Sequence, residues 1–169
     1  MEVTKNYITV NSRETLQQLI LHIRQSEYIA YDIETDSLNP RKGQIIGFSM
    51  CGEIGTSFYM PIMQYLNEEL IEVDIEGTGC HDLAKRTIAL LKGKKLITHN
   101  GAFDLTFTKN FYGIDLLEYL HADTILLVHT VMEEGAFGIG GSPFGLKQIA
   151  QLVQTEIGDR KSTRLNSSH

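Results

Sequence analysis

Residues 28–34 read YIAYDIE, a stretch in which large apolar side chains alternate with small or acidic ones. A two-residue period of this kind is typical of a β-strand with two different faces. One face is expected to carry Ile29, Tyr31 and Ile33, and the other Ala30, Asp32 and Glu34. The strand therefore presents two carboxylates side by side.

Asp32 and Glu34 are candidate metal ligands. Two neighbouring carboxylates on an otherwise apolar strand repel each other, which lowers stability unless a cation lies between them. Hard oxygen ligands favour Mg²⁺ or Mn²⁺ over Zn²⁺. The alternative is an ordinary strand end whose acidic side chains are simply solvated.

A third acidic residue follows a second strand. Residues 95–98 are predicted to form a short strand that leads into a helix from about residue 100 to residue 113. Asn100 and Asp104 lie four residues apart on its first turn and so share one face. Separately, they could be a helix cap and an acid favoured by the helix dipole. Together with the first strand, they make half of a site for two ions about 4 Å apart, which can bind the attacking and leaving oxygens of a phosphodiester.

The remaining periodicity predicts a mixed sheet flanked by helices. Further strands are expected at 7–10, 44–51, 56–61 and 119–122, and further helices at 11–23, 83–91, 123–134 and 144–154. Residues 63–79 read as an acidic surface insertion and residues 135–141 as a Gly-rich turn. This order predicts an α/β protein with an antiparallel three-strand meander followed by parallel βα units.

Two local details complete the predicted elements. Asn11 and Glu14 have the spacing of a capping box at the start of the first helix. Phe103, Phe107 and Phe111 recur every four residues in the helix that carries Asp104, and their rings are expected in the core.

Composition narrows the class of protein. A formal charge of −6 argues against a protein that holds nucleic acid mainly by counterion release, unless metal ions on carboxylates bind the phosphate. No apolar run approaches the roughly 20 residues of a membrane span, and the start lacks a secretory signal. A protein of the cytoplasm with no membrane partner is expected. Cys51 and Cys80 match neither a disulfide framework nor a paired zinc motif and are interpreted as ordinary thiols.

Four segments in order resemble one family. They are DIETDSL at 32–38, HNGAFD at 99–104, ADT at 122–124 and GLKQIA at 145–150. The sequence resembles the 3′-to-5′ proofreading exonuclease domain of family A DNA polymerases, within the superfamily named for four acidic residues. The resemblance covers most of residues 28–154 and implies a ribonuclease-H-like fold.

The resemblance also implies roles for individual residues and partners. The implied catalytic and metal-binding carboxylates are Asp32, Glu34 and Asp104. The implied substrate-binding residues are Thr35, Leu38, Asn100 and Phe103, with Leu38 holding the terminal base and Asn100 shaping the site. The implied cofactors are two divalent ions, Mg²⁺ or Mn²⁺. The implied substrate is a single-stranded or frayed DNA 3′ end, with a polymerase domain in the same full-length chain and a bacterial or phage-infected cell as the setting.

The third motif of that family is missing. A Tyr-x-x-x-Asp that supplies the fourth carboxylate and a tyrosine that orients water should follow residues 145–147, and no such segment is present. Residues 159–169 are polar and basic, and they resemble a translated sequencing adapter. We therefore expect residues 1–158 to be an exonuclease domain that is incomplete at its C-terminal end, with weak or no activity as it stands.

Other functions remain as alternatives. A ribonuclease D-like RNA exonuclease would share the three carboxylates, and a non-catalytic scaffold domain of a polymerase would share the fold. A metal cluster formed by His121, Asp123 and His129 is a weaker interpretation than ordinary packing. The Gly-rich turn is not followed by the Lys and Ser or Thr of a phosphate-binding P-loop.

Overall fold

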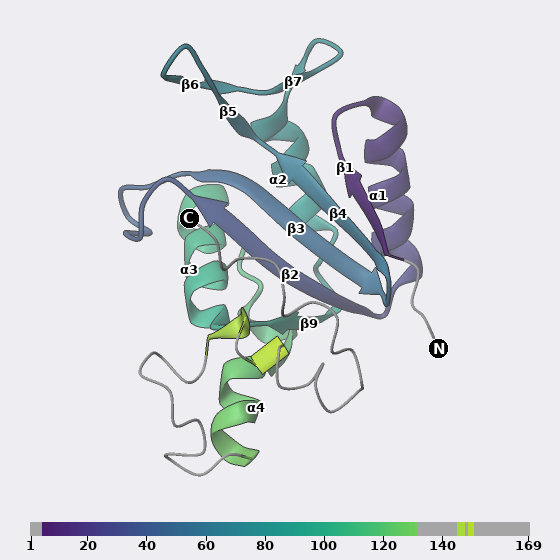
Figure 1. Cartoon of the computed structure of the whole chain (residues 1–169), viewed down its shortest axis with the longest axis vertical. Helices are drawn as coiled ribbons and strands as arrows, with labels where there is room; N and C mark the ends of the chain where they lie inside the picture. Colours follow the sequence, from purple (N-terminus) through teal and green to yellow (C-terminus); the bar gives the residue numbers. More distant parts are fainter. Residues whose placement is uncertain (1–4, 132–144, 148, 151–169) are drawn as a thin grey trace, which may run out of the picture. The chain divides into compact units, whose positions relative to one another are not determined.

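The computed structural model of the chain describes residues 5–131, 145–147 and 149–150 (Figure 1). They fall in two units, Met1–Asp123 and Thr124–His169, each considered by itself. The elements of the first unit are β1 (Asn6–Thr9), α1 (Arg13–Gln25), β2 (Tyr28–Thr35), β3 (Ile45–Glu53), β4 (Thr56–Pro61), β5 (Met63–Leu66), β6 (Glu69–Glu72), β7 (Asp74–Ile75), β8 (Thr78–Gly79), α2 (Cys80–Ala89), β9 (Lys95–Thr98), α3 (Gly101–Tyr112), the 3-10 helix η1 (Leu117–Tyr119) and β10 (Leu120–Asp123). Helix α4 (Thr124–Val131) belongs to the second unit.

Six strands form one mixed sheet in the order β1-β4-β3-β2-β9-β10. Strands β2, β3 and β4 are antiparallel, whereas β1, β9 and β10 run parallel to the strands beside them. This arrangement confirms the predicted meander and the parallel βα units, and it adds β1 as a parallel edge strand. Strand β2 therefore lies inside the sheet, between β3 and β9 (Figure 1).

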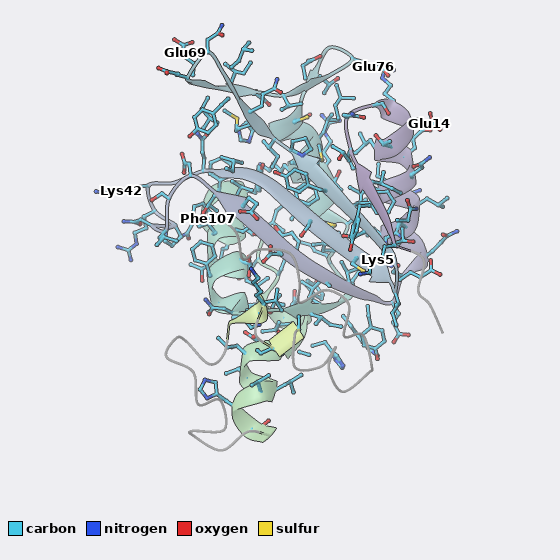
Figure 2. The ribbon with its side chains drawn as sticks, viewed as in Figure 1. Lys5, Glu14, Lys42, Glu69, Glu76 and Phe107 are labelled. Carbon is cyan, nitrogen blue, oxygen red and sulfur yellow. The ribbon has the colours of Figure 1, made fainter. Side chains whose placement is uncertain are left out.

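The core covers one face of this sheet. Along β2 the buried side chains are Ile29, Tyr31 and Ile33, as the alternation predicts. They join a single apolar cluster with Leu19 and Ile23 of α1, Ala84 and Ile88 of α2, and Leu105 and Phe107 of α3. Figure 2 labels Phe107, the fully buried aromatic residue of α3. The opposite face of β2 carries Ala30, Asp32 and Glu34, all exposed.

The predicted cap of the first helix was wrong by one residue. Ser12 is the N-cap residue: its side chain accepts from the Thr15 N–H, and the Thr15 hydroxyl accepts from the Ser12 N–H. Ser12 and Thr15 have the same three-residue spacing as Asn11 and Glu14, and serine caps as well as asparagine does. The sequence pattern alone does not distinguish a cap at Asn11 from a cap at Ser12.

The phenylalanine stripe is only partly in the core. Phe107 is fully buried, Phe103 is half-buried, and Phe111 is 36% exposed, so the expectation for Phe111 was wrong. A step of four residues turns a side chain about 40° around a helix with 3.6 residues per turn. Three rings at this spacing therefore spread over about 80°, which carries the last ring to the edge of the packed stripe.

Residues 63–79 form two short β-hairpins, β5–β6 and β7–β8. Asn67 and Glu68 turn the first hairpin with positive φ angles of 50° and 67°. Figure 2 labels Glu69 on the first hairpin and Glu76 on the second, two of the acidic side chains of this exposed segment. Most of the segment lies at the surface, as predicted, and it has more regular structure than its sequence indicates.

The second unit contains the later predicted elements. Helix α4 begins at Thr124, one residue after the predicted start. The Ile149 N–H donates to the Gly145 carbonyl over 3.1 Å, a helical hydrogen bond within the predicted last helix. The predicted Gly-rich turn, the rest of that helix and the segment 159–169 lie outside the described residues. Within the described part of the chain, no helix is long and apolar enough to cross a membrane.

Candidate functional site

The two carboxylates of β2 lie side by side on its exposed face, as predicted. Asp32 is opposite Ser49 and Glu34 is opposite Gly47 in the antiparallel register with β3. Both acidic side chains are exposed. The face that they share is therefore open to ligands, whereas the other face of the strand belongs to the core.

Asp104 lies against the backbone of this same strand. One of its carboxylate oxygens accepts a hydrogen bond of 3.1 Å from the N–H of Ile33, the residue between Asp32 and Glu34. The side chain of Asp104 is 3% exposed. The structure thus brings the third predicted acid, 71 residues away in the sequence, next to the first two.

The path of β9 explains why this contact forms. Strand β9 pairs with β2 only as far as Ala30, which is opposite Ile97. Beyond that point β9 ends at Thr98 and the chain enters α3, so the edge of β2 loses its neighbouring strand. A backbone N–H at such an edge needs another acceptor when it is buried. The first turn of α3 supplies Asp104 for Ile33.

Burial raises the pKa values of two acids of the site, Asp32 and Asp104. Burial raises the pKa of Asp104 to about 7, with further increases from the charges of Asp32 and Asp123, and the Ile33 N–H acts in the opposite direction. Burial also raises the pKa of Asp32, against a lowering by His99. A divalent cation would offset this cost, because it favours the charged form of every nearby carboxylate.

The three acids lie near one another, but their side chains do not enclose a position for a metal ion. Among the described residues, no group of three or more His, Cys, Asp or Glu side chains is gathered tightly enough to hold a metal ion as it stands. This finding also covers His121 and Asp123, for which a metal cluster with His129 was the weaker interpretation. The donor set fits Mg²⁺ or Mn²⁺ in chemical type, since it consists of carboxylate oxygens, two of them on an exposed strand face.

Asp123 is a site residue whose role sequence reasoning missed. Its two carboxylate oxygens accept hydrogen bonds from the N–H groups of Asn100 and Gly101, over 2.9 and 2.8 Å. These two N–H groups lie at the start of α3, one turn before Asp104. The buried carboxylate of Asp123 therefore fixes the helix end that places Asp104. The ADT segment at 122–124 was the signal available in the sequence.

Asn100 is not the ordinary helix cap that its sequence position suggests. Its backbone is left-handed, with φ 64° and ψ 50°, and its side chain makes no capping hydrogen bond. Gly101 follows because a Cβ atom there would lie 2.2 Å from the Thr98 hydroxyl. The cap is supplied by Asp123, from a strand that follows 22 residues later.

The four predicted substrate-binding residues differ in exposure and in their contacts. Leu38 is 87% exposed on the loop after β2. Thr35 is half-buried, and its hydroxyl donates to the Ser37 carbonyl over 2.9 Å. Asn100 is exposed at the start of α3. Phe103 is half-buried, with its ring 5.6 Å from that of Phe107, so it lies at the border of the core.

Sequence comparison agrees with this geometry. A family profile described as 3′-5′ exonuclease matches residues 7–157 of the chain. The chain belongs to this exonuclease family.

Solved structures with a similar fold include one that is described as an exoribonuclease. Escherichia coli RNase D, an exoribonuclease involved in structured RNA processing, aligns with a TM-score of 0.58 and 16% identity over 95% of this chain and 36% of its own. Brucella melitensis NrnC with bound Mg²⁺ aligns with a TM-score of 0.53 and 19% identity, over 90% of this chain and 62% of its own. NrnC bound to pGG aligns with a TM-score of 0.53 and 19% identity, over 98% and 66%. The exonuclease domain spans less than two thirds of each of these chains.

These alignments, with the sheet order, confirm the predicted ribonuclease-H-like fold. The profile match confirms the predicted membership of the 3′-5′ exonuclease family.

Proposed function

We propose that this exonuclease domain hydrolyses the terminal phosphodiester at the 3′ end of a DNA strand. Its catalytic, metal-binding residues are Asp32, Glu34 and Asp104, and its cofactors are two Mg²⁺ or Mn²⁺ ions. The observation that carries the proposal is the hydrogen bond from the Ile33 N–H to Asp104, which joins the acids of β2 and α3 in one place. The family match supports the reaction class.

In the proposed mechanism the ions supply the chemistry, and the protein holds and orients the carboxylates that bind them. Two divalent ions, when bound, activate water and neutralise the charge that develops on the phosphate and on the leaving oxygen. Asp32 and Glu34 hold their side chains on an exposed face, where a phosphodiester can approach. Asp104 is held by the Ile33 N–H, so its second oxygen keeps a fixed direction. A fixed carboxylate contributes more than a mobile one because its reorganisation is avoided during the reaction.

The loop after β2 supplies the proposed contact for the terminal base. Leu38 is a large apolar side chain that is 87% exposed, close in sequence to Glu34. Packing against an unpaired base would bury this side chain. A frayed or mismatched end enters more readily because it has less pairing to lose. This preference is what a proofreading role in DNA replication requires.

An RNA substrate is the second candidate, and the structural similarity to RNase D supports it. RNase D is described as an exoribonuclease, and its fold matches that of this chain. Hydrolysis of matched DNA and RNA strands of one sequence, with labelled 5′ ends and Mn²⁺ present, separates the two. Faster shortening of the DNA strand from its 3′ end supports the proposal, and faster shortening of RNA replaces it with the ribonuclease D-like alternative.

Metal titration distinguishes an enzyme from a scaffold domain. Calorimetry with Mn²⁺ is expected to detect two ions in the wild-type protein and a loss of at least one in Asp32→Ala. No binding to either protein would establish a non-catalytic scaffold of the same fold. The titration does not depend on turnover.

The boundaries and partners of the domain are part of the same proposal. We assign residues 1–158 to the exonuclease domain and treat 159–169 as foreign to it, which the end of the family match at residue 157 supports. A polymerase domain in the same full-length protein and a cytoplasmic location in a bacterial or phage-infected cell follow from the family resemblance. Sequencing of the gene beyond codon 158 tests these assignments directly.

A further inference from the structure

A tyrosine shares the exposed sheet face with the acids. Tyr59 of β4 is opposite Ser49 of β3, which is in turn opposite Asp32 of β2. Residues paired in this way project their side chains to the same side of a sheet. The neighbours of Tyr59 along β4, Phe58 and Met60, are buried in the core, and Tyr59 itself is 39% exposed. Tyr59 therefore stands on the face that carries the candidate metal ligands.

The phenol ring of Tyr59 lies over Gly47, the residue opposite Glu34. A Cβ atom built at Gly47 would lie 2.5 Å from the Tyr59 hydroxyl oxygen and 2.9 Å from the ring atom Cζ. Any side chain at Gly47 would occupy the position of the hydroxyl group. The absence of a side chain on Gly47 thus lets Tyr59 reach diagonally across β3 toward Glu34.

The electrostatics agree with this placement. Burial and the charge of Glu34 both raise the pKa of Tyr59. A tyrosine phenol is protonated at neutral pH and can donate a hydrogen bond. Glu34 beside it is an acceptor when ionised. The two side chains present a donor and an acceptor on the same face of the sheet.

We propose that the Tyr59 hydroxyl contacts the substrate by donating a hydrogen bond to a hydroxyl group on the terminal sugar at the 3′ end. A sugar hydroxyl both donates and accepts, so it matches a carboxylate acceptor and a phenol donor together. The inference rests on the proposed function, because it takes Glu34 as part of the site. It adds a residue of β4 to the acids of β2 and α3, with Gly47 as the position that makes room for it.

The test measures the preference for a terminal hydroxyl group. Strands with a 5′ fluorophore and a terminal phosphorothioate linkage, which slows hydrolysis, are titrated with protein in Mg²⁺ and followed by anisotropy. One pair of strands ends with or without the 3′-hydroxyl, and a second pair ends with or without the 2′-hydroxyl. Wild-type protein is expected to bind the hydroxyl-bearing strand of one pair about 3- to 10-fold more tightly, the range for one neutral hydrogen bond. The pair that shows the preference identifies the hydroxyl.

Two variants remove the contact by different routes. Tyr59→Phe keeps the ring and removes the donor, and Gly47→Ala keeps the donor and displaces it. Both are expected to reduce the preference to the part that Glu34 supplies, while retaining the wild-type circular dichroism spectrum. Tyr65→Phe is the matched control, since Tyr65 is 72% exposed on the β5–β6 hairpin and is expected to leave the preference unchanged.

The outcomes separate this inference from the function on which it rests. If Tyr59→Phe retains the full preference, or wild-type protein shows none while still binding strands, the contact does not exist and the exonuclease proposal stands. If wild-type protein binds no strand at all, the proposed function fails and the inference fails with it. A reduced preference in Tyr59→Phe with normal preference in Tyr65→Phe supports the contact.

Discussion

Asp104 offers a sharp test of the metal site, because its charge is costly when no metal is bound. The folded-state pKa of Asp104 is about 7, against about 3.9 for an aspartate in an unfolded chain. A raised carboxylate pKa means that its favourable contribution is complete below about pH 4 and is lost as pH rises to about 7. The gap corresponds to roughly 4 kcal/mol at most, and burial at 3% exposure leaves little solvent screening to reduce it.

Asp104→Asn should therefore change the pH dependence of stability in metal-free protein. Asparagine keeps an oxygen for the Ile33 N–H and carries no charge at any pH. We expect the free energy of unfolding of the variant, relative to wild-type, to increase between about pH 4 and about pH 8 by up to roughly 4 kcal/mol. Urea unfolding followed by circular dichroism, in buffer with EDTA, measures the difference.

Divalent metal should make wild-type protein more stable to unfolding than Asp104→Asn, the reverse of the order without metal. Mg²⁺ is expected to stabilise wild-type protein at about pH 8 and to stabilise Asp104→Asn much less, because binding to the folded state shifts unfolding by mass action. Glu34→Gln is a second test of the metal site, and it should also lose metal stabilisation. If the free energies of unfolding of wild-type protein and Asp104→Asn without metal change with pH in parallel, the charge of Asp104 is not costly in the folded state. Equal stabilisation of both by Mg²⁺ would refute Asp104 as a ligand.

Three further predictions use other contacts of the fold. Asp123→Asn leaves one oxygen for two N–H groups at the start of α3, so Mn²⁺ affinity in calorimetry should fall about 10-fold with little change in the circular dichroism spectrum. Thr108→Val removes the partner, 2.9 Å away, of the buried Tyr31 hydroxyl and should lower the free energy of unfolding by about 1–3 kcal/mol in urea titrations. Burial raises the pKa of the Cys80 thiol to about 11, so a thiol reagent near neutral pH should label Cys51 in the folded protein and Cys80 only after unfolding, as mass spectrometry can show.

The strand that carries Asp32 and Glu34 could be predicted because its information is local. Alternation with a period of two sets which side chains of β2 face the core, and this needs no knowledge of the rest of the fold. The structure confirms both faces of that strand. The start of α3 at Gly101 also agrees with the helix that was predicted from about residue 100.

The capping of α3 could not be predicted, because its acceptor comes from another part of the chain. Local rules give the cap to the side chain of Asn100. The left-handed backbone at Asn100 and the carboxylate of Asp123 replace that arrangement, and both depend on β10 lying beside β9. The cap of the first helix was predicted one residue too early for a simpler reason. Ser12 and Asn11 are equally good caps by sequence.

The position of the site follows from one change of neighbour along β2. Up to Ala30 the strand is bonded to β9, and beyond it the Ile33 N–H is bonded to a side chain instead. The side chain that takes over is Asp104, so the residue that completes the backbone hydrogen bonding is also the candidate third ligand. A substitution at Asp104 must then be interpreted in both roles at once. Asp104→Asn separates them, because asparagine keeps the hydrogen bond and removes the charge.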